Sequence, residues 1–216
     1  MNPHSDNRDQ ANQRSSGAQQ PAQTPGSDQL AELLKVLPIG PIRRATFIET
    51  YDVKVHGEHE VSFVLPAGRS RMDILRESQA TVCFQGEFWA EQLDRWESNL
   101  KFKEAATSPE RIHINARVEG GGEKTRSQQE DVLRSKNLEM PSLEDLATAF
   151  VVHYVVEREP LFGWQDESEG WSRIVRAVGG ALYFVRDGGL FENTISDDEH
   201  DHSCIAVAAK VPATTA

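Results

Sequence analysis

An acidic segment near the end of the chain holds the residue types best suited to metal chemistry. Residues 197–202 read Asp-Asp-Glu-His-Asp-His, which places four carboxylates and two imidazoles next to one another. Oxygen and nitrogen donors of this kind bind Zn²⁺, Mn²⁺ or Ca²⁺, and alternate residues at a strand edge point to the same side. We therefore predict Asp198, His200 and His202 as candidate ligands of a divalent metal.

The same segment also has a simpler interpretation. It lacks a fixed ligand spacing such as His-Glu-x-x-His, and acidic loops between strands are usually solvated turns that discourage edge pairing. A metal-dependent hydrolase that uses residues 197–202, with help from His153 or Glu192, is therefore an alternative function and not the leading one. We predict no cofactor apart from the divalent metal of this alternative.

Other residues could in principle carry chemistry. His153 lies within an apolar stretch and could act as a general base if a carboxylate reached its ring, although a hydrogen-bonded core histidine is the simpler interpretation. No Gly-x-Ser-x-Gly or Ser-x-x-Lys motif appears in a recognisable local context. The remaining histidines of the expected folded part are His56, His59 and His113. The sequence therefore contains no complete catalytic set.

Two further motifs fail on their details. Residues 120–125 read Gly-Gly-Gly-Glu-Lys-Thr, but the spacing Gly-x-x-x-x-Gly-Lys-Ser/Thr of a phosphate-binding loop is absent, so we expect a plain turn into a helix. Cys83 and Cys204 are the two cysteines, and they have no Cys-x-x-Cys spacing that would indicate zinc or redox chemistry. We interpret both as buried thiols.

Composition limits the class of protein. The chain has 216 residues with 23 Lys plus Arg and 34 Asp plus Glu, so its formal net charge is −11. An acidic chain of this kind argues against sequence-independent nucleic-acid binding, which needs a basic surface. Residues 1–27 are mainly polar and predict a disordered tail. The N-terminus lacks the pattern of a secretory signal, so we expect a soluble, cytoplasmic protein without a membrane segment.

The C-terminal third shows the clearest strand pattern. Two Gly-Gly pairs, at 179–180 and 188–189, lie between short runs of β-branched and aromatic residues, which is typical of hairpin turns. The predicted four-strand antiparallel meander comprises residues 172–178, 181–186, 190–195 and 203–211. The first of these also has helical spacing, and we favour a strand for its β-branched content.

A core helix precedes this meander. Residues 142–158 begin with Ser142, whose hydroxyl can accept from the amide of Asp145, and continue as a run that is apolar nearly all round. Such a helix is expected to be buried on more than one side. The run is too short and too interrupted to span a bilayer.

The first half of the chain predicts a hairpin, several helices and a strand. We expect the hairpin at 43–55 and 60–65, a strand at 110–119, and helices from 28, from 70, after Gly86, and at 127–136 with Ser127 as its cap. Trp89 and Trp96 lie in the apolar stripe of the third helix. They predict a core face or a face that meets another subunit more than a ligand-stacking site.

Together these patterns predict a single α+β domain over residues 28–212. It would have an antiparallel sheet, made of the hairpin, the central strand and the meander, packed with four to five helices. The leading hypothesis for function is a non-enzymatic binding or interaction module. Its partner would be another protein or a second copy of the chain, and no nucleic acid or membrane.

Overall fold

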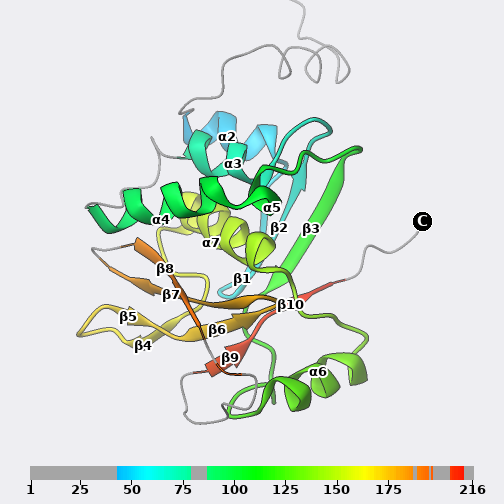
Figure 1. Cartoon of the computed structure of the whole chain (residues 1–216), viewed down its shortest axis with the longest axis vertical. Helices are drawn as coiled ribbons and strands as arrows, with labels where there is room; N and C mark the ends of the chain where they lie inside the picture. Colours follow the sequence, from blue (N-terminus) through cyan, green and yellow to red (C-terminus); the bar gives the residue numbers. More distant parts are fainter. Residues whose placement is uncertain (1–42, 79–86, 187–188, 195, 197–204, 212–216) are drawn as a thin grey trace, which may run out of the picture.

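The computed structural model describes residues 43–78, 87–186, 189–194, 196 and 205–211 of the chain. In these ranges it has six helices, which are α2 (Arg44–Thr50), α3 (Arg71–Ser78), α4 (Glu87–Ser98), α5 (Leu100–Lys103), α6 (Arg126–Ser135) and α7 (Leu143–Glu157). The strands are β1 (Lys54–Gly57), β2 (Glu60–Leu65), β3 (Glu110–Asn115), β4 (Trp164–Asp166), β5 (Trp171–Ser172), β6 (Ile174–Ala177), β7 (Gly180–Val185), β8 (Gly189–Asn193), β9 (Ile205–Val207) and β10 (Ala209–Lys210). The predicted α+β class is confirmed (Figure 1). The tail over 1–27, the helix expected from residue 28, and both cysteines lie outside the described residues.

The first sheet has four strands in the order β1-β2-β3-β10, and every neighbouring pair is antiparallel. β2 and β3 pair from Glu60 opposite Asn115 to Leu65 opposite Glu110. Alternate residues of these two strands are completely buried, namely Val61, Phe63, Leu65, Ile112 and Ile114. The strands predicted over 60–65 and 110–119 are therefore present, the second ending at Asn115.

Residues 43–55 do not form the long strand that the sequence suggested. The chain first forms α2 and enters β1 only at Lys54. Phe47 and Tyr51 are four residues apart, so a helix places both on one face; both are completely buried, with their ring centroids 4.9 Å apart. The prediction was wrong because a spacing of four residues is compatible with a period of two and with a period of 3.6.

The second sheet has six strands and is mixed. Its order is β4-β5-β7-β6-β9, with β8 paired to β7. β6 and β8 each pair antiparallel with β7, so three strands of the predicted meander are confirmed, and residues 172–178 are strand and not helix. The turn between β6 and β7 contains Gly179 at φ +96°, a conformation that favours glycine.

The structure of residues 203–211 differs from the prediction. Residues 203–211 do not add a fourth antiparallel strand to the meander: β9 pairs parallel with β6, and β10 pairs with β3 of the first sheet. The two β portions are consequently two sheets, not one, and this segment connects them (Figure 1). Ala206, Ala208 and Ala209 of this segment are buried.

Strands β4 and β5 form a short hairpin. β4 and β5 pair antiparallel, and a carboxylate oxygen of Asp166 accepts from the backbone amides of Ser168 and Glu169 at 2.9 and 3.1 Å. Hydrogen bonds of this kind stabilise a tight turn. The turn ends at Gly170, which has φ +75°.

Helix α7 is the central element of the core, as predicted. It contacts α2 and α3 on one side and strands β2, β3 and β7 of the two sheets on the other (Figure 1). Twelve of its residues are buried. The predicted cap is confirmed, because the Ser142 hydroxyl accepts from the Asp145 amide at 3.1 Å.

The carboxylate of Asp145 does not reach back to its own cap. It accepts instead from Arg71 Nε at 2.6 Å and from Lys210 Nζ at 3.2 Å, although Asp145 itself is nearly buried. Lys210 also donates to Glu110 at 3.1 Å. This ionic network joins the start of α7 to α3 and to strands β3 and β10.

Helix α6 begins slightly earlier than predicted and has a different cap. Thr125, not Ser127, accepts from the amide of Gln128, and the Gln128 side chain accepts from the Thr125 amide. Leu133 packs with Val118 and Val207 in a small cluster apart from the main core. The Gly-rich residues 120–122 are thus a turn into this helix, and Thr125 is engaged as its cap.

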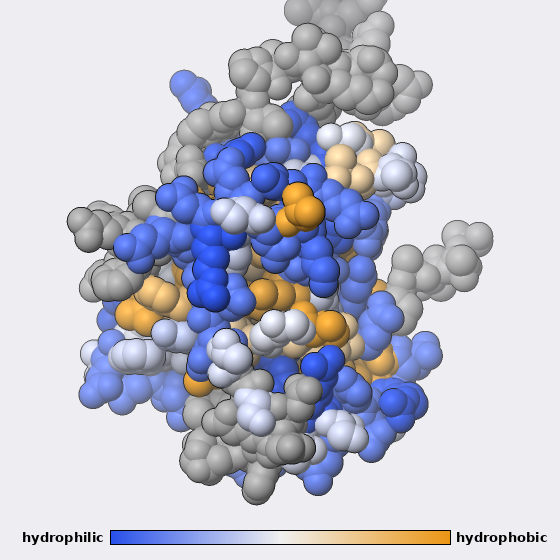
Figure 2. Space-filling model, in the orientation of Figure 1, coloured by the Kyte–Doolittle hydropathy of each residue, from blue (hydrophilic) through white to orange (hydrophobic). Residues whose placement is uncertain are grey.

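The surface in Figure 2 is mostly hydrophilic, with smaller hydrophobic areas between the charged residues. The large apolar side chains exposed on the described part of the chain are scattered, namely Leu100, Trp171 and Val178. None of the helices within the described ranges is long and apolar enough to cross a membrane.

Candidate functional site

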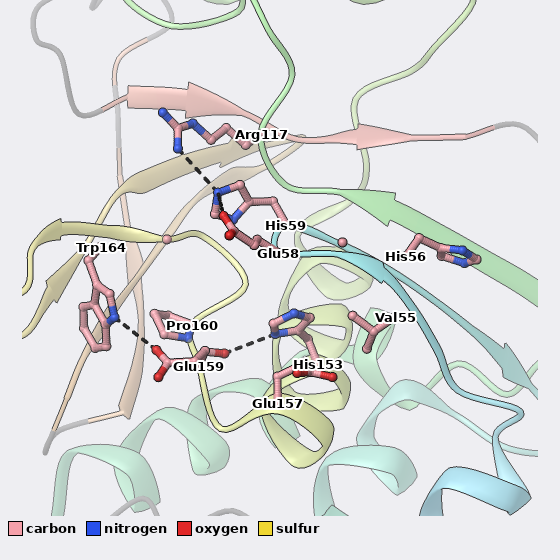
Figure 3. A pocket seen from close by; sticks show the side chains of 12 residues that line it. Val55, His56, Glu58, His59, Arg117, His153, Glu157, Glu159, Pro160 and Trp164 are labelled. Atoms are coloured by element: carbon pink, nitrogen blue, oxygen red, sulfur yellow. Dashed lines mark hydrogen bonds and ion pairs between the residues drawn. The ribbon is translucent and has the colours of Figure 1, made fainter.

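A cleft of about 710 Å³ lies between the turn that joins β1 to β2, the C-terminal end of α7 and the segment that follows α7 (Figure 3). Its apolar walls are Val55, Pro160 and Trp164. Its polar groups come from three histidines, three glutamates and one arginine. The two histidines that matter most, His59 and His153, come from opposite walls.

His153 forms the buried part of this cleft. Its side chain is only 1% exposed, and Nδ1 lies 3.1 Å from the backbone carbonyl oxygen of Glu159. A carbonyl only accepts hydrogen bonds, so Nδ1 carries the proton and Nε2 presents a lone pair. Nε2 is buried and has no hydrogen-bond partner among the residues that the structure describes. Burial also lowers the pKa of His153, which keeps the ring neutral.

His59 is held in the same way from the other side. Its Nδ1 lies 3.0 Å from the carbonyl oxygen of Leu161 and therefore donates to it. Its Nε2 accepts from Arg117 Nη1 at 3.4 Å. Two neighbouring carbonyl groups of the segment after α7 thus fix the tautomers of two histidines that are far apart in the sequence.

The end of α7 explains how these carbonyl groups reach the two rings. Arg158 ends the helix in the left-handed region, at φ 62°, and its amide still bonds to the carbonyl of Tyr154. The chain then turns back, so that Glu159 lies beside the His153 ring. Phe162 packs against Phe150 of α7, with ring centroids 5.0 Å apart, and anchors the returning segment in the core.

Gly163 completes this wall. It has φ +69°, and a Cβ atom at this position would lie 2.7 Å from Cε1 of His59. A side chain here would be strained by the backbone and would also collide with the imidazole. The close packing of this glycine against His59 therefore fixes the position of the ring.

Carboxylates surround the cleft. Glu157 follows His153 by four residues and lies on the same face of α7, and Glu58 is almost fully exposed beside His59. Glu159 accepts from Trp164 Nε1 at 3.1 Å. Figure 3 shows His153 and Glu157 on one side of the hollow and Glu58 and His59 on the other.

The predicted metal ligands are not placed. Asp198, His200 and His202 lie outside the described residues, so the metal prediction stays a prediction. Within the described ranges, no group of three or more His, Cys, Asp or Glu side chains could hold a metal ion. Glu192, the other residue predicted to assist, accepts from Trp96 Nε1 at 3.4 Å and lies 3.9 Å from Arg95 Nε.

The tryptophan stripe of α4 is part of the core where the structure describes it. Trp96 is 1% exposed and stacks on Phe102, with ring centroids 5.1 Å apart. The core interpretation is therefore confirmed for Trp96. Trp89 belongs to the same helix, but its side chain lies outside the described part.

Of the two histidines that are held by carbonyl groups of the segment after α7, sequence reasoning singled out only His153. His153 attracted attention because a histidine within an apolar helix is unusual, and it was the hydrogen-bonded core histidine that we expected. His59 had no such signal, since it lies in a hairpin turn where polar residues are common. No family model, curated protein or solved structure matches this chain, and the cleft is accordingly interpreted from its own geometry.

Proposed function

We propose that the protein is a binding module whose ligand site is the cleft between the β1–β2 turn and the end of α7. The observation that carries this proposal is the buried, unpartnered Nε2 of His153. Leaving a buried polar atom without a partner costs about 1–3 kcal/mol. A ligand that donates a hydrogen bond to this nitrogen removes that cost, so the bound state is favoured.

The size of the cleft supports the proposal. A volume of about 710 Å³ lies in the range of sites for small molecules or for single side chains of a peptide. Such sites combine apolar walls with few, well-placed polar groups. Val55 and Pro160 supply the apolar wall here, and His153 supplies the oriented acceptor.

The lining also favours binding over catalysis. The described residues around the cleft include no serine, threonine, cysteine or lysine that could act as a nucleophile. An oriented imidazole acceptor without a neighbouring hydroxyl, thiol or amine nucleophile is suited to recognising a donor group. Metal-dependent hydrolysis at residues 197–202 stays the alternative, and it requires ligands outside the described residues.

A fragment screen tests the proposal directly. Ligand-observed saturation-transfer NMR of the full chain, with a library of neutral, basic and acidic fragments, should identify binders that are lost in H153F. The matched control is H113F, because His113 lies on β3 and pairs with Glu60 at 2.6 Å instead of lining the cleft. Binders that survive H153F unchanged, or a library with no binder, would contradict a ligand site at this cleft.

A further inference from the structure

We infer that the cleft binds a primary ammonium group on a short alkyl chain, with His153 Nε2 as the buried acceptor and Glu157 as its counter-charge. This inference rests on the proposed function. It deepens that proposal by assigning the chemical class of the ligand.

The hydrogen-bonding capacity of the cleft requires a donor. His153 Nε2 is an acceptor because Nδ1 donates to the Glu159 carbonyl. The Glu58 and Glu157 carboxylates add further acceptors. Arg117 is the one donor side chain with a fixed charge among the described lining residues, and it donates to His59. A ligand rich in acceptors would leave the buried nitrogen unsatisfied, whereas an ammonium offers three donors.

The charge of the cleft points to the same class. Three glutamates and one arginine line it, and His153 is neutral, so the lining is acidic. The chain as a whole carries a formal charge of −11. An acidic, partly desolvated site within an acidic protein attracts cations and opposes anions.

The shape of the acceptor set favours an ammonium over a guanidinium. The planar guanidinium group binds best when two parallel donors meet one carboxylate, whereas an ammonium is a compact charge whose donors point in three directions. The buried acceptor here is a single imidazole lone pair, and the carboxylate of Glu157 lies one helical turn further along. Val55 and Pro160 then provide apolar surface for the alkyl chain.

Two kinds of ligand carry such an ammonium group, namely a free aliphatic amine and the lysine side chain of a peptide. Both present the same group to the cleft. The peptide source would add backbone contacts outside the hollow, so the two should differ in affinity.

The test uses the full chain at pH 7.5 and titrates butylamine, Nα-acetyl-lysine methylamide, butylguanidine, butanol, butyrate and Zn²⁺. Long-range ¹H–¹⁵N NMR of the histidine rings reports the state of Nε2 directly. We expect the His153 Nε2 signal to move with butylamine and with the lysine derivative, and not with butyrate. The tighter binder of the two amines identifies the source.

Two variants distinguish the loss of the Glu157 charge from a loss of folding. E157Q should weaken amine binding about tenfold, the loss expected when one charged hydrogen-bond partner is removed. E60Q is the matched control, because Glu60 pairs with His113 outside the cleft, and it should bind amines as the unchanged chain does. Thermal unfolding of both variants checks that they fold.

The outcomes distinguish this inference from the proposed function. Binding of butyrate, butanol, Zn²⁺ or butylguanidine in preference to the amines, or equal amine affinity in E157Q, would overturn the ammonium assignment and leave the cleft as a ligand site. A complete lack of binding by every probe here and in the fragment screen would overturn both.

Discussion

The hydroxyl of Tyr51 donates to a carboxylate oxygen of Glu77 at 2.5 Å, and both side chains are buried between α2 and α3. The other carboxylate oxygen of Glu77 lies 3.2 Å from Arg69 Nη2, and Arg69 is itself 5% exposed. Burial, with the neighbouring Glu77 carboxylate, raises the pKa of Tyr51, so the phenol stays protonated. A fully buried ionic group thus lies beneath the helix that the sequence had suggested was a strand.

Replacing Glu77 with Gln should destabilise the protein by about 3–5 kcal/mol, because it leaves the guanidinium of Arg69 buried without its counter-charge. Chemical denaturation measures this change. The matched control is E97Q, which removes an acid from the partly exposed Arg76–Glu97 pair and should change the free energy of unfolding by no more than about 1 kcal/mol. Similar losses in the two variants would mean that the buried pair has no special role.

Replacing Gly163 with Ala should cost about 1–3 kcal/mol of stability, because φ +69° disfavours a side chain and the new Cβ would contact the His59 ring. G57A is the control, since a Cβ at Gly57 meets no atom within 4 Å. Thermal unfolding compares the two, and the His59 ring signals in NMR should shift in G163A. A G163A variant with unchanged stability would show that the loop after α7 tolerates displacement.

The stability of the protein should fall as the pH drops below about 6.5, in part through His153. Burial lowers the pKa of His153 in the folded chain, so between the two pKa values the unfolded chain binds a proton that the folded chain does not. Stability therefore rises with pH in this window and is fully present above it. H153N, whose amide can still donate to the Glu159 carbonyl, should flatten the stability profile just below about pH 6.5. An unchanged slope would mean that another group causes the pH dependence.

The metal prediction for residues 197–202 is tested by thermal unfolding in chelator and then with Zn²⁺, Mn²⁺, Ca²⁺ or Mg²⁺. A metal that binds only the folded chain, at about a hundred times its dissociation constant, should add roughly 2.7 kcal/mol of stability. The H200A/H202A double variant should lose this gain. The absence of any metal-specific shift would leave the segment as a polar loop and remove the basis for the hydrolase alternative.

Local patterns in the sequence determined most of the individual elements. The apolar run after Ser142 predicted the core helix and its cap, and the Gly-Gly pairs predicted the antiparallel pairing of β6, β7 and β8. These features depend on residues within one or two turns of one another, where backbone sterics and hydrophobic periodicity act directly. The α+β class follows from them.

Tertiary structure decided the pairing of the last strands and the composition of the cleft. Nothing local in residues 203–211 distinguishes a fourth meander strand from a segment shared by two sheets, because strand pairing depends on partners distant in the chain. His59 and His153 likewise become one site only because the chain after Arg158 turns back and offers two carbonyl groups to two separate rings. The residue types were visible in the sequence, but the unpartnered nitrogen was not, since it results from how helix α7 and the β1–β2 turn pack together.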